Sequence, residues 1–160
     1  MRNRTTTAAV IGAVLLVGLV GCNPQDPVDP ESASKPPAAK NSEAAGPTAK
    51  SAADHLAEAT GVTTLGDPQD NTDACSNKAA GKEPHENDCS QLITTDTVSI
   101  YEFKTAKVSA DWVARMKKNG DWRQVDRFAL AWTARDQGLT SDGRRTELET
   151  ALADLVKKNK

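Results

Sequence analysis

Two cysteines and a histidine lie close together in the middle of the chain, in the segment CSNKAAGKEPHENDC. Thiolates and imidazoles bind zinc, so Cys75, His85 and Cys89 form a candidate metal site, and His55 is available as a fourth ligand. Structural zinc sites usually take cysteines in close pairs, whereas Cys75 and Cys89 are far apart in the segment. The spacing favours a disulfide, and a metal site built from His55, His85 and nearby acids is the alternative.

Nucleophilic catalysis needs a serine, threonine or cysteine beside a base. His55 and His85 are the two histidines of the chain, and neither lies in a recognisable catalytic motif. Both are predicted to be surface residues, which favours a protein that is not an enzyme. A hydrolase-like envelope enzyme remains an open alternative, and it requires a pocket that brings one of these histidines to a nucleophile.

Three tryptophans suggest a stacking platform for a saccharide or a peptidoglycan ligand, because indole rings have apolar faces and a polar edge. Trp112 falls on the apolar side of a predicted helix, and Trp132 shares a predicted strand face with Leu130, so both are expected in the core. Trp122 follows a predicted turn and is expected to be partly exposed. Trp122 is therefore the one candidate ligand-binding residue of the three.

Residues 1–21 have the pattern of a secretory signal peptide. Arg2 and Arg4 precede an apolar run, residues 8–21, that is shorter than the roughly 20 residues needed to span a bilayer. The run ends in Leu19-Val20-Gly21-Cys22, which resembles the bacterial lipobox. The resemblance implies that Cys22 receives a diacylglyceryl group, becomes the new N-terminus, and makes membrane lipid a partner of the protein.

Membrane attachment by two acyl chains is stable, since burial contributes about 0.8 kcal/mol per CH₂ and one chain holds a protein only marginally. Residues 22–50, the lipidated cysteine and a Pro/Ala/Ser-rich stretch, are predicted to form a disordered tether with a span of about 30 Å. Residues 51–160 are predicted to form one domain. This layout resembles small lipoproteins of high-GC Gram-positive bacteria, which implies an extracytoplasmic location that permits disulfides.

Charge excludes one class of partner. Removal of Arg2 and Arg4 with the signal peptide changes the formal net charge from −2 to −4, and no basic cluster is large enough to neutralise a phosphate backbone. Nucleic acid is therefore not expected as a partner, and no cofactor is predicted.

Hydrophobic periodicity predicts the elements of the domain. Helices are expected from Ser51, from Ser109 to Gly120, and from Thr140 or Ser141; strands are expected at 62–65 and 97–103 and as a pair within 121–136, with a turn or bulge near Asp126. Residues 66–90 are expected to be a long loop. The order predicts a small α+β domain with a short, mainly antiparallel sheet and helices packed on one face.

Location and composition together favour a non-catalytic binding or accessory module, anchored in the cell membrane and exposed on its extracytoplasmic face. Its expected partner is an envelope protein or a wall ligand. A metal-handling lipoprotein that uses His55 and His85 is the alternative function.

Overall fold

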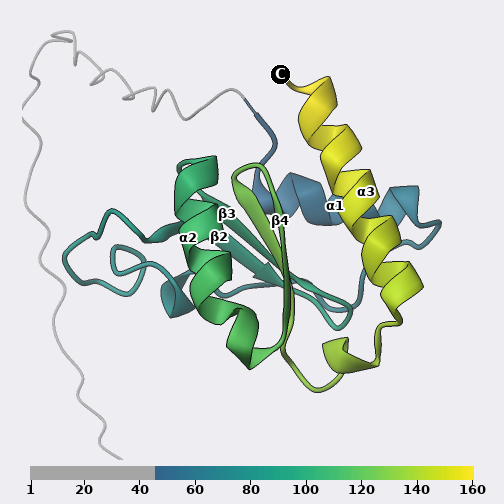
Figure 1. The fold of residues 1–160 in the computed structure, drawn as a ribbon, viewed down its shortest axis with the longest axis horizontal. Coiled ribbons are helices and arrows are strands. Elements are labelled where there is room, and N and C mark those ends of the chain that lie inside the picture. The colour runs from purple at the N-terminus through teal and green to yellow at the C-terminus, as the bar shows by residue number, and fades with distance from the viewer. Residues whose placement is uncertain (1–45) are drawn as a thin grey trace, which may run out of the picture. The chain divides into compact units, whose positions relative to one another are not determined.

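Five strands form one antiparallel sheet in the order β1-β2-β3-β5-β4 (Figure 1). The computed structural model describes residues 46–160, so the signal peptide, Cys22 and most of the predicted tether lie outside the described residues. The strands are β1 (Gln69–Asp70), β2 (Cys89–Thr94), β3 (Ser99–Phe103), β4 (Asp121–Val125) and β5 (Phe128–Trp132). The predicted α+β class and antiparallel sheet are confirmed.

Three α-helices cover the sheet, and they lie on both of its faces. The helices are α1 (Ala49–Ala59), α2 (Ala106–Met116) and α3 (Asp142–Lys158), with short 3₁₀ turns η1 (Thr72–Ala74), η2 (Lys117–Asn119) and η3 (Gln137–Leu139). Helices α1 and α3 pack on one face and α2 on the other (Figure 1). The expectation that the helices share one face is therefore corrected. Within residues 46–160, the helices are too short or too polar to cross a bilayer.

Strand β5 explains why a second face is covered. Phe128, Leu130 and Trp132 point into the core beneath α1 and α3, while Ala129 and Ala131 point toward α2. Side chains alternate between the two faces of a strand, so the small alanines leave room for a helix to approach. All five residues of β5 are buried, as expected for a central strand covered on both sides.

The β4–β5 hairpin contains the turn predicted near Asp126. Val125 pairs with Phe128, which leaves Asp126 and Arg127 as a two-residue loop, and Asp126 has a positive φ of 53°. Such tight hairpin loops favour residues that tolerate positive φ, aspartate among them.

Several predicted element boundaries are wrong by a few residues. Thr48, rather than Ser51, caps α1, and Ser51 completes a capping box with it. Thr105 caps α2, whereas Ser109 lies within that helix, fully buried, and donates a hydrogen bond to the Phe128 carbonyl at 2.9 Å. Ser141 caps α3, so of the two predicted starts, Thr140 and Ser141, the second is the one observed.

Two strand predictions are also corrected. Residues 62–65 form no strand, and the segment 66–90, expected to be a loop, contains β1 and the start of β2 at Cys89. Strand β2 escaped prediction because its first residues are polar and its pairing with β3 is long-range.

The first turn of α1 is attached to the sheet by polar contacts. Glu102 of β3 is only 8% exposed; its carboxylate accepts a hydrogen bond from the Ala49 N–H at 3.0 Å and pairs with Arg127 at 3.3 Å. Arg127 in turn donates to the Pro47 carbonyl at 2.7 Å. A carboxylate at a helix N-terminus also complements the helix dipole. These contacts hold the first turn of α1 against the sheet.

Candidate binding site

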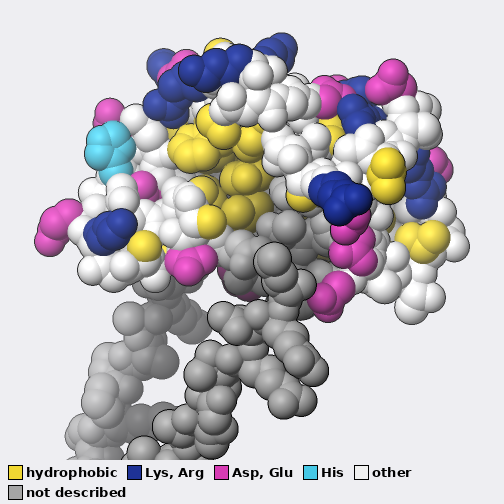
Figure 2. Space-filling view, turned by 90° about the horizontal axis from the view of Figure 1, so that it is seen from below, with side chains coloured by type: hydrophobic (Ala, Val, Ile, Leu, Met, Phe, Trp, Pro, Cys, Tyr) yellow, Lys and Arg dark blue, Asp and Glu magenta, His cyan; other side chains and the backbone are white. Residues whose placement is uncertain are grey.

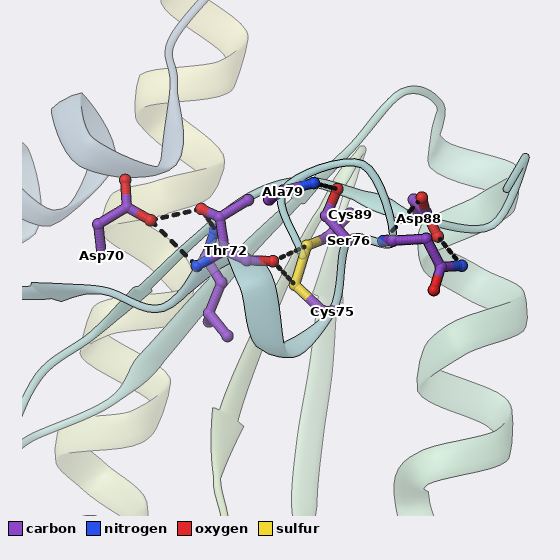
Figure 3. The surroundings of a disulfide bond; sticks show 9 residues. Asp70, Thr72, Cys75, Ser76, Ala79, Asp88 and Cys89 are labelled. Atoms are coloured by element: carbon purple, nitrogen blue, oxygen red, sulfur yellow. Dashed lines mark hydrogen bonds between the residues drawn. A yellow bond between two sulfur atoms is a disulfide. The ribbon is translucent and has the colours of Figure 1, made fainter. Parts of the chain in front are cut away.

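A disulfide joins Cys75 to Cys89, as predicted, and closes the loop of residues 75–89, here called the disulfide loop (Figure 3). The two Cα atoms are 5.5 Å apart, an ordinary distance for a disulfide. The Cys89 N–H donates to the Cys75 carbonyl at 3.1 Å, so the loop ends are also joined through the backbone. Both sulfur atoms lie 3.7 Å from the Thr72 carbonyl oxygen; they carry no proton, so these are packing contacts.

Asp88 is the hydrogen-bond acceptor that connects two parts of the disulfide loop. Its carboxylate accepts hydrogen bonds from the backbone N–H and side-chain amide of Asn77, at 2.9 and 3.0 Å, and from the His85 N–H at 3.0 Å. The hydrogen bond from His85 is the main cause of a lowered pKa for Asp88. With the disulfide, these contacts give a polar, exposed loop a defined shape.

Thr72 joins the start of this region to strand β2. Its hydroxyl accepts a hydrogen bond from the Leu92 N–H at 3.1 Å and donates to Asp70, which also accepts from the Thr72 N–H (Figure 3). The Thr72 hydrogen bonds lower the pKa of Asp70.

A cavity of about 370 Å³ separates the disulfide loop from helix α2. We call it the loop–helix cavity. Lys82 and His85 line it from the loop, and Trp112 and Arg115 line it from the helix. Its volume is within the range of small-ligand sites, and most of the residues that line it are polar or charged, with Trp112 as the one aromatic side chain.

An aromatic cluster of Tyr101, Phe103, Trp112 and Trp122 lies beside this cavity and shares Trp112 with it. The ring centroids of Tyr101 and Trp122 are 5.0 Å apart, and those of Phe103 and Trp112 are 5.5 Å apart. Tyr101 and Trp112 are half-buried, and burial raises the pKa of the Tyr101 phenol. Figure 2 shows hydrophobic side chains gathered in a hollow on one face of the molecule, with Lys and Arg side chains along one of its edges.

Trp122 does not have the partial exposure predicted from its position after a turn. It is 3% exposed, because Tyr101 and helix α2 cover its side of the sheet. Trp132 is buried as predicted, while Trp112 is only half-buried. Trp112, rather than Trp122, is therefore the partly exposed tryptophan beside the cavity.

Arg115 covers the outer side of Trp112. Its guanidinium carbon lies 5.5 Å from the centre of the Trp112 ring, and its Nε donates to the Asp111 carbonyl at 3.2 Å. Such an arrangement permits a cation–π contact. The buried indole nitrogen of Trp112 has no hydrogen-bond partner within residues 46–160, so packing alone positions the ring.

The structure does not bring the two histidines together. His85 lines the loop–helix cavity, whereas His55 lines a second cavity of about 560 Å³ between α1 and α3, with Glu147 and Asp154. Among the described residues, no group of three or more His, Cys, Asp or Glu is arranged to hold a metal ion. The disulfide also removes both cysteines from the predicted ligand set.

Ser76 is the one residue of the nucleophile type that lines the cavity near His85. Its Oγ accepts a hydrogen bond from the Ala79 N–H at 3.4 Å, and His85 Nδ1 accepts one from the Asn87 N–H at 3.3 Å. No hydrogen bond joins Ser76 to His85 in the described part of the chain, so the nucleophile–base contact of a hydrolase is not formed there.

Sequence reasoning missed Tyr101, Trp112 and Arg115 as site residues. The available signal was the placement of Arg115 three positions after Trp112, which puts both on one side of a helix. The meeting of this helix with the disulfide loop has no local signal. Comparison with protein-family models, with curated proteins and with solved structures found no match to this chain.

Proposed function

We propose that this protein is a lipoprotein, anchored through Cys22 at the extracytoplasmic face of the cell membrane, which acts as a non-catalytic binding module. The observation that carries the proposal is the loop–helix cavity, where a half-buried tryptophan faces a covalently closed loop. Its ligand is an envelope protein or a component of the cell wall.

Preorganisation supports a binding role. The disulfide and the three hydrogen bonds to Asp88 already fix the loop wall, and Trp112 packs against Phe103 on the helix wall. A ligand that enters such a site orders few side chains, which lowers the entropic cost of association.

The hydrogen bonds already made by Asp88 and His85 support a role without catalysis. Asp88 accepts three hydrogen bonds from its own loop, and His85 Nδ1 accepts one from the backbone. A general base needs a free acceptor within reach of the group it deprotonates.

The anchor is tested by mass spectrometry of the full-length protein recovered from a bacterial host with a lipoprotein-processing pathway. We expect a membrane-bound product whose N-terminal residue is Cys22 carrying a diacylglyceryl group. The matched variant Cys22→Ser is expected to lose the lipid. A processed wild-type product in the culture medium with an unmodified thiol at position 22 would contradict the anchor.

The binding surface is tested by photo-crosslinking in intact cells. A photoreactive amino acid at Lys82, on the loop–helix cavity, is expected to give a discrete crosslinked envelope product. The same group at Lys158, which lines the cavity between α1 and α3, is the control and is expected to give none. Equal crosslinking from both positions, or crosslinking from Lys158 alone, would contradict the assignment of the surface.

A further inference from the structure

The charged side chains that line the loop–helix cavity are of both signs. Lys82 and Arg115 line it together with the carboxylates of Asp73 and Asp88. Further exposed charges of both signs lie in the same loop and in helix α2: Lys78, Glu83, Glu86, Lys107 and Asp111. A site selects an ion through an excess of the opposite charge. Since the cations and carboxylates of this wall balance, the cavity favours a ligand without net charge.

Polar groups of the cavity wall are left unused by the fold. Within residues 46–160, the side chains of Asp73, Lys82 and Asn87 form no hydrogen bond or ion pair. His85 Nδ1 accepts the Asn87 N–H at 3.3 Å, so the proton of its neutral imidazole lies on Nε2, which is one more donor. The wall therefore offers hydrogen-bond donors and acceptors at the same time.

This mixture of groups matches a ligand that carries hydroxyls. A hydroxyl both donates and accepts hydrogen bonds, so it can pair with a carboxylate, an ammonium or a carboxamide. An apolar ligand would displace water from these groups and leave them without partners, at a cost in affinity. A neutral molecule with many hydroxyls, such as a saccharide, satisfies the wall without bringing a charge.

Trp112 supplies an apolar surface for the same ligand. It is the one aromatic residue that lines the cavity, it is half-buried, and Phe103 packs against it with ring centroids 5.5 Å apart. The face of an indole ring is apolar, as is the C–H face of a sugar ring, so the two can stack. Arg115 lies over the ring but is exposed, and its Nη atoms donate to no group within residues 46–160. A ligand can therefore displace it from the ring.

We propose that the ligand of the loop–helix cavity is a neutral saccharide of one or two sugar rings. One ring stacks on Trp112, and its hydroxyls form hydrogen bonds with Asp73, Lys82 and Asn87. The cavity volume of about 370 Å³ is near the lower end of the range of small-ligand sites, which suits a short saccharide. This inference rests on the proposed binding function and selects the carbohydrate of the cell wall as the ligand.

The test is calorimetric titration of the chain of residues 22–160 carrying Cys22→Ser, which retains the mature sequence without lipid. The probes are neutral disaccharides built from each common hexose and N-acetylhexosamine, with uronic-acid and sulfated disaccharides for comparison. We expect a neutral disaccharide to bind with a dissociation constant below about 1 mM. Its affinity should change less than about twofold between low and high salt, because a neutral ligand has no charge to screen.

Two substitutions in the cavity wall supply the matched comparison. Asn87→Ala removes a carboxamide that holds no part of the fold, and it should weaken the disaccharide about fivefold. Asn119→Ala, at an exposed position that does not line the cavity, is the control and should leave the affinity unchanged.

Trp112→Ala should abolish measurable binding, whereas Trp112→Phe keeps an aromatic face and should retain part of the affinity. Circular dichroism checks that these variants are folded. Because Trp112 packs against Phe103, its loss affects the core as well, and the Asn87→Ala result then tests the site.

The inference is overturned if no neutral disaccharide binds, or if only charged saccharides bind and lose affinity at high salt. It is also overturned if Asn87→Ala leaves the affinity for the disaccharide unchanged. Crosslinking from Lys82 does not depend on the chemistry of the ligand. A discrete crosslinked product together with no saccharide binding would therefore keep the proposed function and reject only its carbohydrate ligand.

Discussion

A single buried amide, that of Gln137, joins two distant segments of the chain. Gln137 is fully buried, and its Nε2 donates to the Thr95 carbonyl at 2.8 Å and to the Ser99 hydroxyl at 2.9 Å. Its Oε1 accepts from the Ala134 N–H at 3.2 Å. The side chain therefore connects the β2–β3 turn to the segment that leads into α3.

Replacement of this amide by an apolar side chain is expected to be costly. Gln137→Leu should lower the free energy of unfolding by about 2 kcal/mol, because buried donors and acceptors lose their partner. Gln124→Leu is the control, since Gln124 is exposed and its Nε2 also donates to two carbonyls, and it should cost less than about 1 kcal/mol. Urea unfolding measures both, and equal losses would contradict the argument.

At the scale of elements, ion pairs attach α3 to the edge strand β4. Asp121 of β4 pairs with Arg123 and with Arg145 of α3, each at 3.1 Å, and Arg123 also reaches Glu149 at 3.2 Å. The guanidinium carbons of both arginines lie within 5.4 Å of the Trp132 ring centre. The ion pairs between α3 and β4 therefore pack against the buried ring of Trp132.

The ion pairs of Asp121 predict that the stability of the fold depends on pH. Burial alone would raise the pKa of Asp121, but the hydrogen bonds and charges of Arg123 and Arg145 outweigh it, so the pKa of Asp121 lies below that of an unperturbed aspartate. The ionised form therefore stabilises the folded state above the unfolded pKa, and this contribution is lost as the pH falls through the folded pKa. The stability difference between wild type and Asp121→Asn should be constant above about pH 5 and shrink below pH 4. Urea unfolding from pH 2 to 7 measures it.

The disulfide loop gives a second prediction at this scale. Cys75→Ser with Cys89→Ser should lower the free energy of unfolding by about 3 kcal/mol, because an open chain has more conformational freedom when unfolded. Wild type treated with dithiothreitol is expected to match the double variant, and the double variant should not respond to the reductant. A double variant as stable as oxidised wild type would show that Asp88 and the surrounding contacts suffice.

Prediction from sequence succeeded where the signal is local. The alternation in TVSIYEF predicts β3, with Ile100 and Tyr101 on opposite faces. A hydroxyl residue before an amphipathic run predicts the start of α3 at Thr140 or Ser141, and Ser141 is the cap. The disulfide followed from the number of cysteines. The burial of Trp122 and the presence of the loop–helix cavity could not be predicted. Both depend on segments that meet only in the folded state, and no local sequence pattern specifies such contacts.

For the whole molecule, the structure predicts where truncation begins to unfold the domain. A chain that begins at Gly46 keeps the Thr48 cap and the Pro47–Arg127 contact, whereas one that begins at Lys50 loses both and leaves Glu102 without the Ala49 N–H. The shorter chain should be less stable by about 1 to 3 kcal/mol. Thermal unfolding of the two chains measures the difference, and equal midpoints would contradict the role of this first turn.

Under the proposed anchoring through Cys22, the same first turn has a mechanical consequence. Tension that reaches the domain from residue 45 is applied at Pro47 and Ala49, which are held by Arg127 of the β4–β5 hairpin and Glu102 of β3. The load therefore passes directly into the middle of the sheet and bypasses the far end of α1. In a single-molecule pulling experiment, Arg127→Ala should make the N-terminal helix peel away at lower force.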